Sequence, residues 1–167
     1  MKFYKVHSAK FKNDKVIFVP EQFDQIGPDA FLQTNFDIIV LSRRVKSISA
    51  HAFSSLKRCK VYIHKNTTDI DSMAFDDMDI GNVFYCERDC VAYNMCIERG
   101  LSVNEDIEEF LSYAENLKSE QNAFKGKMQS ARPVTKKAEP ITTAPFNKIP
   151  ATEPIPREPS QSKSEPT

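Results

Sequence analysis

The chain has 167 residues, 40% of them hydrophobic, and its 23 Lys and Arg residues balance its 23 Asp and Glu residues. This length fits one domain with a tail, and the balance excludes a chain-wide field that would attract nucleic acid or an anionic membrane. The sequence shows neither the apolar core of a signal peptide nor a membrane span of about 18 apolar residues. We therefore expect a soluble, cytoplasmic protein.

The first 14 residues are predicted to cap the N-terminal end of the fold. KFYKV (2–6) alternates weakly between polar and apolar residues, and a polar turn follows at Asn13 and Asp14. We expect this segment to pair with an apolar strand at 15–19 and so to protect the edge of that strand.

From residue 16 onward the sequence repeats with a step of 22 residues. Three segments align without a gap: FDQIGPDAF (23–31), VKSISAHAF (45–53) and TTDIDSMAF (67–75). The same step joins four apolar runs: VIFVP (16–20), IIVLS (38–42), KVYIH (60–64) and NVFYC (82–86). A unit this short cannot bury its apolar face alone, so copies must stack and share a core.

Stacking predicts an α/β solenoid in which equivalent strands become parallel neighbours. Phe31, Phe53 and Phe75 should form one internal column, with an Ala before each Phe at a crowded turn. The inward strand positions are predicted to be 17/19, 39/41, 61/63 and 83/85, because strand residues alternate between two faces.

The pattern I-x-V-P…F-x-x-I-x-x-x-A-F resembles the BspA-type leucine-rich repeat over about residues 15–103. The segment NVFYCERDCVAYNMCIERGLSV (82–103) is similar to the closing repeat of that family, in which a strand is followed by a short helix. The resemblance implies a leucine-rich-repeat stack that serves protein–protein interaction. Its closing helix would bury Ala92, Tyr93, Cys96 and Ile97, with Gly100 at its C-terminal end.

Two further segments follow the repeats. Residues 104–130 are predicted to form an amphipathic helix, because Ile107, Phe110, Leu111, Ala114 and Leu117 share one stripe that Gln121, Phe124 and Met128 continue. Residues 131–167 hold most of the prolines and are predicted to be a disordered tail.

The residues that point out of the strands form the candidate partner-binding site. They are Phe18, Val40, Tyr62 and Phe84, flanked by Val16 and Ile38. Aromatic side chains bury about 150 to 250 Å² each, so this ladder exceeds the apolar patches that monomers usually expose. Either the helix at 104–128 folds back over the ladder, or a protein partner occupies it.

Other chemistry finds little support. The cysteines at 59, 86, 90 and 96 do not follow a zinc signature, and the acidic residues around 69–79 do not follow a calcium loop. The best candidate for anion binding is a basic group of Arg43, Arg44, Lys46 and Lys65, which is more simply a charged flank. Phosphate-binding, nucleophile-elbow and zinc-protease motifs are absent from the sequence.

The sequence therefore predicts a non-enzymatic protein–protein interaction module. We expect a protein partner, and no cofactor, metal ion, nucleic acid or membrane. An alternative is an accessory subunit, structural or regulatory, that is tethered through its helix and tail. A hydrolase is a distant third.

Overall fold

The computed structural model describes residues 1–130. For residues 1–127 it also describes the surroundings of the side chains. The described residues belong to one compact unit. The tail predicted to be disordered, 131–167, lies outside the described residues.

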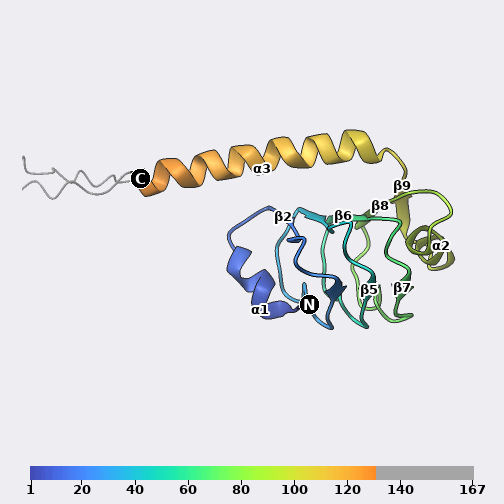
Figure 1. Cartoon of the computed structure of the whole chain (residues 1–167). Helices are drawn as coiled ribbons and strands as arrows, with labels where there is room; N and C mark the ends of the chain where they lie inside the picture. The colour runs from blue at the N-terminus through green and yellow to red at the C-terminus, as the bar shows by residue number, and fades with distance from the viewer. Residues whose placement is uncertain (131–167) are drawn as a thin grey trace, which may run out of the picture. The chain divides into compact units, whose positions relative to one another are not determined.

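The repeats build two parallel sheets that enclose one core (Figure 1). The five-stranded sheet has the order β2 (Val16–Phe18), β4 (Ile38–Val40), β6 (Lys60–Ile63), β8 (Val83–Cys86) and β9 (Ser102–Asn104). The four-stranded sheet has the order β1 (Lys2–Phe3), β3 (Gln25–Ile26), β5 (Ser47–Ile48) and β7 (Asp69–Ile70). Each of the three central coils supplies one strand to each sheet, as the pairs β2 and β3, β4 and β5, and β6 and β7 show, so the α/β solenoid is confirmed.

The 22-residue step sets the strand register through the first three coils. Val16 pairs with Ile38, and Ile38 with Lys60. In the four-stranded sheet the repeat isoleucines are in line, because Ile26 pairs with Ile48 and Ile48 with Ile70.

The predicted phenylalanine column is confirmed. The rings of Phe31 and Phe53 are stacked with centroids 5.6 Å apart, and those of Phe53 and Phe75 with centroids 5.7 Å apart. The alanines that precede these residues are fully buried. Their size suits the close approach of successive coils, because Phe31 N donates to Ala52 O at 3.1 Å.

The last coil departs from the predicted register by one residue. Lys60 pairs with Val83 and Tyr62 with Tyr85, a step of 23 residues. Phe84 therefore points into the core, where its ring meets that of Phe75 edge-on at 5.1 Å, while Tyr85 and Val83 lie on the outer face. The prediction that Phe84 points outward, with Val83 and Tyr85 inward, is wrong.

An extra residue in the preceding turn causes this shift. Phe53 precedes the strand residue Lys60 by seven positions, whereas Phe75 precedes its equivalent Val83 by eight. The turn loops out at Ile80, which is fully exposed, and at Gly81, whose φ of 107° suits glycine. The apolar run NVFYC fits either register, so an ungapped alignment does not reveal the insertion.

The side chain of Asn82 satisfies the backbone groups that the irregular turn leaves unpaired. Its Oδ1 accepts a hydrogen bond from Cys59 N at 2.8 Å, and its Nδ2 donates to Leu56 O at 2.9 Å and to Asp79 O at 2.8 Å. Asn82 is itself buried. A buried amide with three good partners holds the turn in one conformation.

The N-terminal segment closes its end of the solenoid in a different way from the prediction. β1 pairs with β3 in the four-stranded sheet, through Lys2 with Gln25 and Phe3 with Ile26. The expected pairing with the strand at 15–19 is therefore wrong. The chain then forms α1 (Lys5–Ser8) and the 3₁₀ turn η1 (Ala9–Phe11), which leave β2 as the edge strand of the five-stranded sheet.

The closing helix, α2 (Val91–Glu98), covers the other end. Ala92 and Cys96 are fully buried and Tyr93 is half-buried, but Ile97 is 55% exposed, so its predicted burial is wrong. Gly100, with φ 68°, reverses the chain after the helix. Leu101 N then donates to Cys96 O, and the chain continues into β9, which the sequence analysis did not predict.

The last described element is α3 (Ile107–Ser130). It lies along the outer face of the five-stranded sheet, and its C-terminal end continues past β2 (Figure 1).

Candidate interaction surface

Helix α3 covers the outward face of the five-stranded sheet, where the predicted site residues lie. Five of the six belong to the cluster beneath α3: Val16, Ile38, Val40 and Tyr62, which are buried, and Phe18, which is half-buried. Phe84 is the exception, because it lies in the core between the two sheets. Tyr85 takes its place on the outer face.

The N-terminal half of α3 is held by apolar contacts. Phe110 stacks on Tyr85 with ring centroids 3.8 Å apart and an interplanar angle of 11°. Phe110 and Ala114 are buried, and Ile107, Leu111 and Leu117 pack beside them. Of the two coverings that the sequence left open, the structure therefore contains the intramolecular one.

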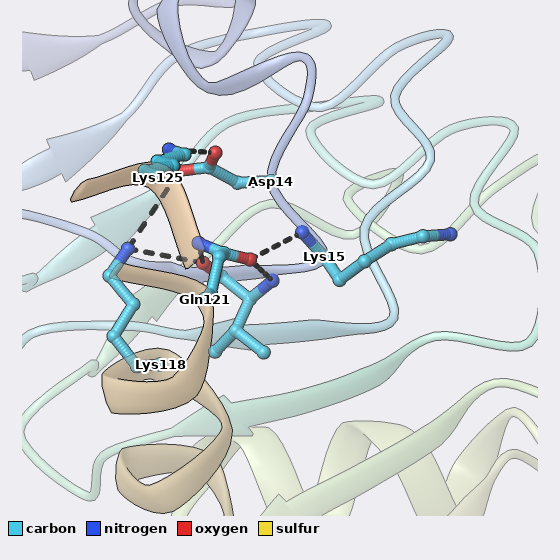
Figure 2. A network of polar contacts seen from close by, with 6 residues as sticks. Asp14, Lys15, Lys118, Gln121 and Lys125 are labelled. Atoms are coloured by element: carbon cyan, nitrogen blue, oxygen red, sulfur yellow. Dashed lines mark hydrogen bonds and ion pairs between the residues drawn. The ribbon is translucent and has the colours of Figure 1, made fainter. Parts of the chain in front are cut away.

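The C-terminal half of α3 is held mainly by polar contacts (Figure 2). Gln121 Oε1 accepts hydrogen bonds from Lys15 N at 2.7 Å and from Val16 N at 3.2 Å. Gln121 Nε2 and Lys118 Nζ both donate to Val16 O, at 3.4 Å and 3.1 Å. One turn of the helix thus contacts the backbone at the start of β2.

A buried carboxylate strengthens this attachment. Asp14 is buried and forms ion pairs with Lys125 and, at 4.0 Å, with Lys118 (Figure 2). Burial lowers the pKa of Lys118, and the negative charge of Asp14 partly offsets that effect. Removing Asp14 would leave two ammonium groups close together without a counter-charge.

A groove of about 530 Å³ remains uncovered along one flank of α3. Its apolar lining comes from Val16 and Ile38 on the sheet and from Tyr113, Leu117 and Phe124 on the helix. Tyr113 and Phe124 are 49% and 65% exposed, which is unusual for large apolar side chains on a helix that is otherwise docked.

Charged residues line the sheet side of this groove at the strand starts. Lys15 and Asp37 form an ion pair of 3.6 Å. Lys60 Nζ lies 5.3 Å from the centre of the Tyr113 ring, and Arg58 stands in the adjacent turn. Within residues 1–127, neither Lys60 nor Arg58 forms an ion pair with a carboxylate.

The cysteines are placed as structural groups. Burial, together with the nearby charge of Asp37, raises the pKa of the Cys59 thiol to about 12. A hydrogen bond with Cys96, together with burial, raises the pKa of Cys86 far above the ordinary thiol range. A thiol that stays protonated is a poor nucleophile and a poor metal ligand. No group of three or more potential metal ligands is found in the part of the chain that the structure describes.

The remaining charged candidates serve as surface ion pairs. Arg43 and Arg44 lie near Glu21, at 3.8 and 3.7 Å, and Lys65 pairs with Glu87 at 2.9 Å. Part of the acidic segment is paired in the same way, because Asp76 and Asp79 pair with Arg99 and Lys57. Neither set forms a concave anion or cation site.

Comparison with known protein families agrees with the coiled architecture. The model of the BspA type leucine rich repeat region matches residues 3–90 in six copies. The chain belongs to the BspA-type leucine-rich-repeat family. The match begins at Phe3, the second residue of β1, and it ends just before α2.

This BspA-type protein matches none of the curated proteins or solved structures that were compared with it. Leucine-rich repeats generally serve protein–protein interaction. Among the described helices, none is both long enough and apolar enough to cross a membrane.

The polar half of the surface is not predictable from the sequence. The helical spacing puts Gln121 on the same stripe as the apolar residues of α3, but nothing in the sequence shows that its amide meets the β2 backbone. Asp14 was assigned to a polar turn, although it is buried against α3. Both contacts join residues more than 100 positions apart, and a local pattern carries no signal for such pairs.

Proposed function

We propose that this protein is a non-enzymatic interaction module that binds a partner protein in the groove beside α3. The observation that supports this proposal is that α3 covers only part of the sheet. Val16 and Ile38 contribute apolar atoms to a groove that is open to solvent, and the exposed rings of Tyr113 and Phe124 form its other wall.

The groove suits a protein ligand better than a small molecule. Both walls supply apolar side chains, and charged side chains from the sheet and from the helix line the groove as well. Apolar anchor positions combined with a polar rim are usual in protein–protein interfaces. The sequence placed the binding site on the bare ladder. With α3 in position, the ladder contributes only its margin, through Val16 and Ile38.

Site-specific photo-cross-linking in the host cell tests this proposal. A photoreactive phenylalanine replaces Tyr113 in the groove or, as a matched control, Tyr4 on the N-terminal segment, whose exposure of 43% is similar to the 49% of Tyr113. We expect an adduct of discrete mass at position 113 and none at position 4. Phe124→Ser in the same chain should reduce the adduct without lowering the melting temperature.

Equal cross-linking at both positions, or none at 113, would contradict the groove as the binding site. The alternative, an accessory subunit tethered through its helix and tail, stays a prediction, as do the cytoplasmic location and the absence of a nucleic-acid partner. The same experiment tests the tether. If a chain truncated after residue 130 still gives the adduct at position 113, binding in the groove does not require the tail.

A further inference from the structure

The edge of β2 presents backbone groups that no strand occupies. β2 is the first strand in the order β2-β4-β6-β8-β9. Ile38 N donates to Lys15 O at 3.1 Å, and Val19 N donates to Val40 O at 2.9 Å. Because backbone groups alternate in direction along a parallel strand, residues 15, 17 and 19 face β4, whereas Val16 and Phe18 face away from it.

A side-chain amide takes the place of a neighbouring strand at Val16. Gln121 accepts from Val16 N and donates to Val16 O, which are the two bonds that a strand residue would make (Figure 2). Phe18, the next residue that faces the edge, has no such partner among residues 1–130. Lys118 Nζ also donates to Val16 O. An edge covered only by side chains is protected from strand pairing only while those side chains stay in place.

α3 reaches beyond the edge of β2, where Lys118 and Lys125 also contact Asp14 in the segment before that strand. The four-stranded sheet begins with β1, but the five-stranded sheet begins one coil later, with β2. α3 continues from Gln121 to Ser130, about 13 Å at 1.5 Å per residue, whereas one added strand needs about 4.8 Å. Phe124 lies in this extension and is 65% exposed, so the helix keeps an apolar side chain beyond the sheet.

The surroundings of this edge are basic. Lys10, Lys12, Lys15, Lys118 and Lys125 lie on the segments that border it. The carboxylates near them are Asp14, which is paired with two of these lysines, Asp37, which is paired with Lys15, and Glu120, which lines the groove with Lys15 and Lys125. The surplus of positive charge favours an acidic ligand.

We propose that the edge of β2 accepts an extended acidic segment of a partner protein as an added strand. The backbone of that segment replaces the Gln121 amide at Val16 and pairs with the free groups of Phe18. Main-chain hydrogen bonds supply the affinity, and the lysines select acidic side chains. This surface goes beyond the groove, because it depends on the β2 backbone rather than on Tyr113.

A capped octapeptide of alternating valine and glutamate is a suitable probe, with the full chain as receptor. We expect saturable binding, measured by fluorescence anisotropy, and slower hydrogen exchange at the Phe18 amide. Gln121→Ala should tighten binding about fivefold, because the peptide no longer competes with the side-chain amide for one net hydrogen bond. Asn122→Ala is the matched control, since Asn122 is exposed on the same helix, and it should leave the affinity unchanged.

Two control peptides separate strand addition from charge attraction. A peptide with lysine in place of glutamate should not bind, and neither should one whose central valine is proline, which cannot donate to a strand ladder. Binding that persists with the proline peptide, or that leaves Phe18 exchange unchanged, overturns the proposal. Weaker binding to Gln121→Ala, or no binding to either receptor, overturns it as well. None of these results bears on cross-linking at Tyr113, so the groove proposal is tested separately.

Discussion

The ring of Phe110 lies flat on the ring of Tyr85, with centroids 3.8 Å apart, and this contact joins α3 to the last coil of the solenoid. Phe110 is buried, whereas Tyr113, one turn later, is half exposed. The two aromatic residues therefore separate docking of the helix from the proposed recognition of a partner.

Phe110→Ala should lower the free energy of unfolding by about 3 kcal/mol, because it removes a buried aromatic side chain and leaves a cavity over Tyr85. Tyr113→Ala, the matched change on the same helix, should cost less than about 1 kcal/mol. Urea denaturation followed by circular dichroism measures both. Similar losses for the two variants would mean that Phe110 does not anchor the helix.

Phe53→Ala should cost about 4 kcal/mol, because Phe53 is packed between Phe31 and Phe75 in the internal column. Each coil contacts mainly its neighbours, so a gap in the middle of the stack weakens the coils on both sides. Ile80→Ala is the control and should change stability by no more than about 0.5 kcal/mol, since Ile80 is fully exposed. A loss of stability in Phe53→Ala as small as that in Ile80→Ala would contradict a continuous core.

Asn82→Ala should cost about 2 to 3 kcal/mol, because it leaves Cys59 N, Leu56 O and Asp79 O without their partner. Asn66→Ala provides the comparison. Asn66 is exposed, and its side chain makes one hydrogen bond, to Arg43 O, so less than about 1 kcal/mol is expected. Thermal melts of both variants test this difference, and the melting temperature should fall more for Asn82→Ala than for Asn66→Ala.

Stability should fall at alkaline pH. Burial raises the pKa of the Cys59 thiol from 9.0 to about 12, and burial beside Glu87 raises the pKa of Tyr62 from 10.0 to about 12. Between those values the unfolded chain releases protons that the folded chain keeps, so the free energy of unfolding decreases as pH rises from 9 toward 12.

Chemical denaturation at a series of pH values tests this dependence. Cys59→Ala should flatten the fall that begins near pH 9, and Tyr62→Phe should flatten the part above pH 10. Below pH 9 neither variant should alter the pH dependence of stability. A wild-type protein whose stability stayed constant up to pH 11 would contradict the protonated, buried state of both groups.

The sequence predicted the coil, the column and most of the register because each follows from a local, repeated constraint. The predicted register of β8 was wrong for a physical reason. An apolar run such as NVFYC fits either alternation, so the extra residue at Ile80 and Gly81 becomes visible only when the partner strand is known. β3, β5 and β7 of the four-stranded sheet were missed because two residues are too short to show an alternating pattern.

The candidate site was predictable only in part. The apolar ladder and the stripe of α3 both follow from side-chain periodicity, and the structure brings them together through Phe110 and Tyr85. The pairing of Asp14 with Lys125 and of Gln121 with β2 was not predictable. Polar contacts of this kind depend on the final position of α3, and any exposed Lys or Gln would look the same in the sequence.

The contacts of α3 run from Tyr85 in the last coil to Val16 in the first, and the dimensions of helix and sheet are commensurate. The eleven residue steps from Phe110 to Gln121 span about 16 Å, while the three steps from β8 to β2 span about 14 Å. Nearly one helical turn therefore stands over each rung. A solenoid lengthened by one coil would need one more turn of α3 to keep both attachments. The length of the helix therefore matches the number of coils in this protein.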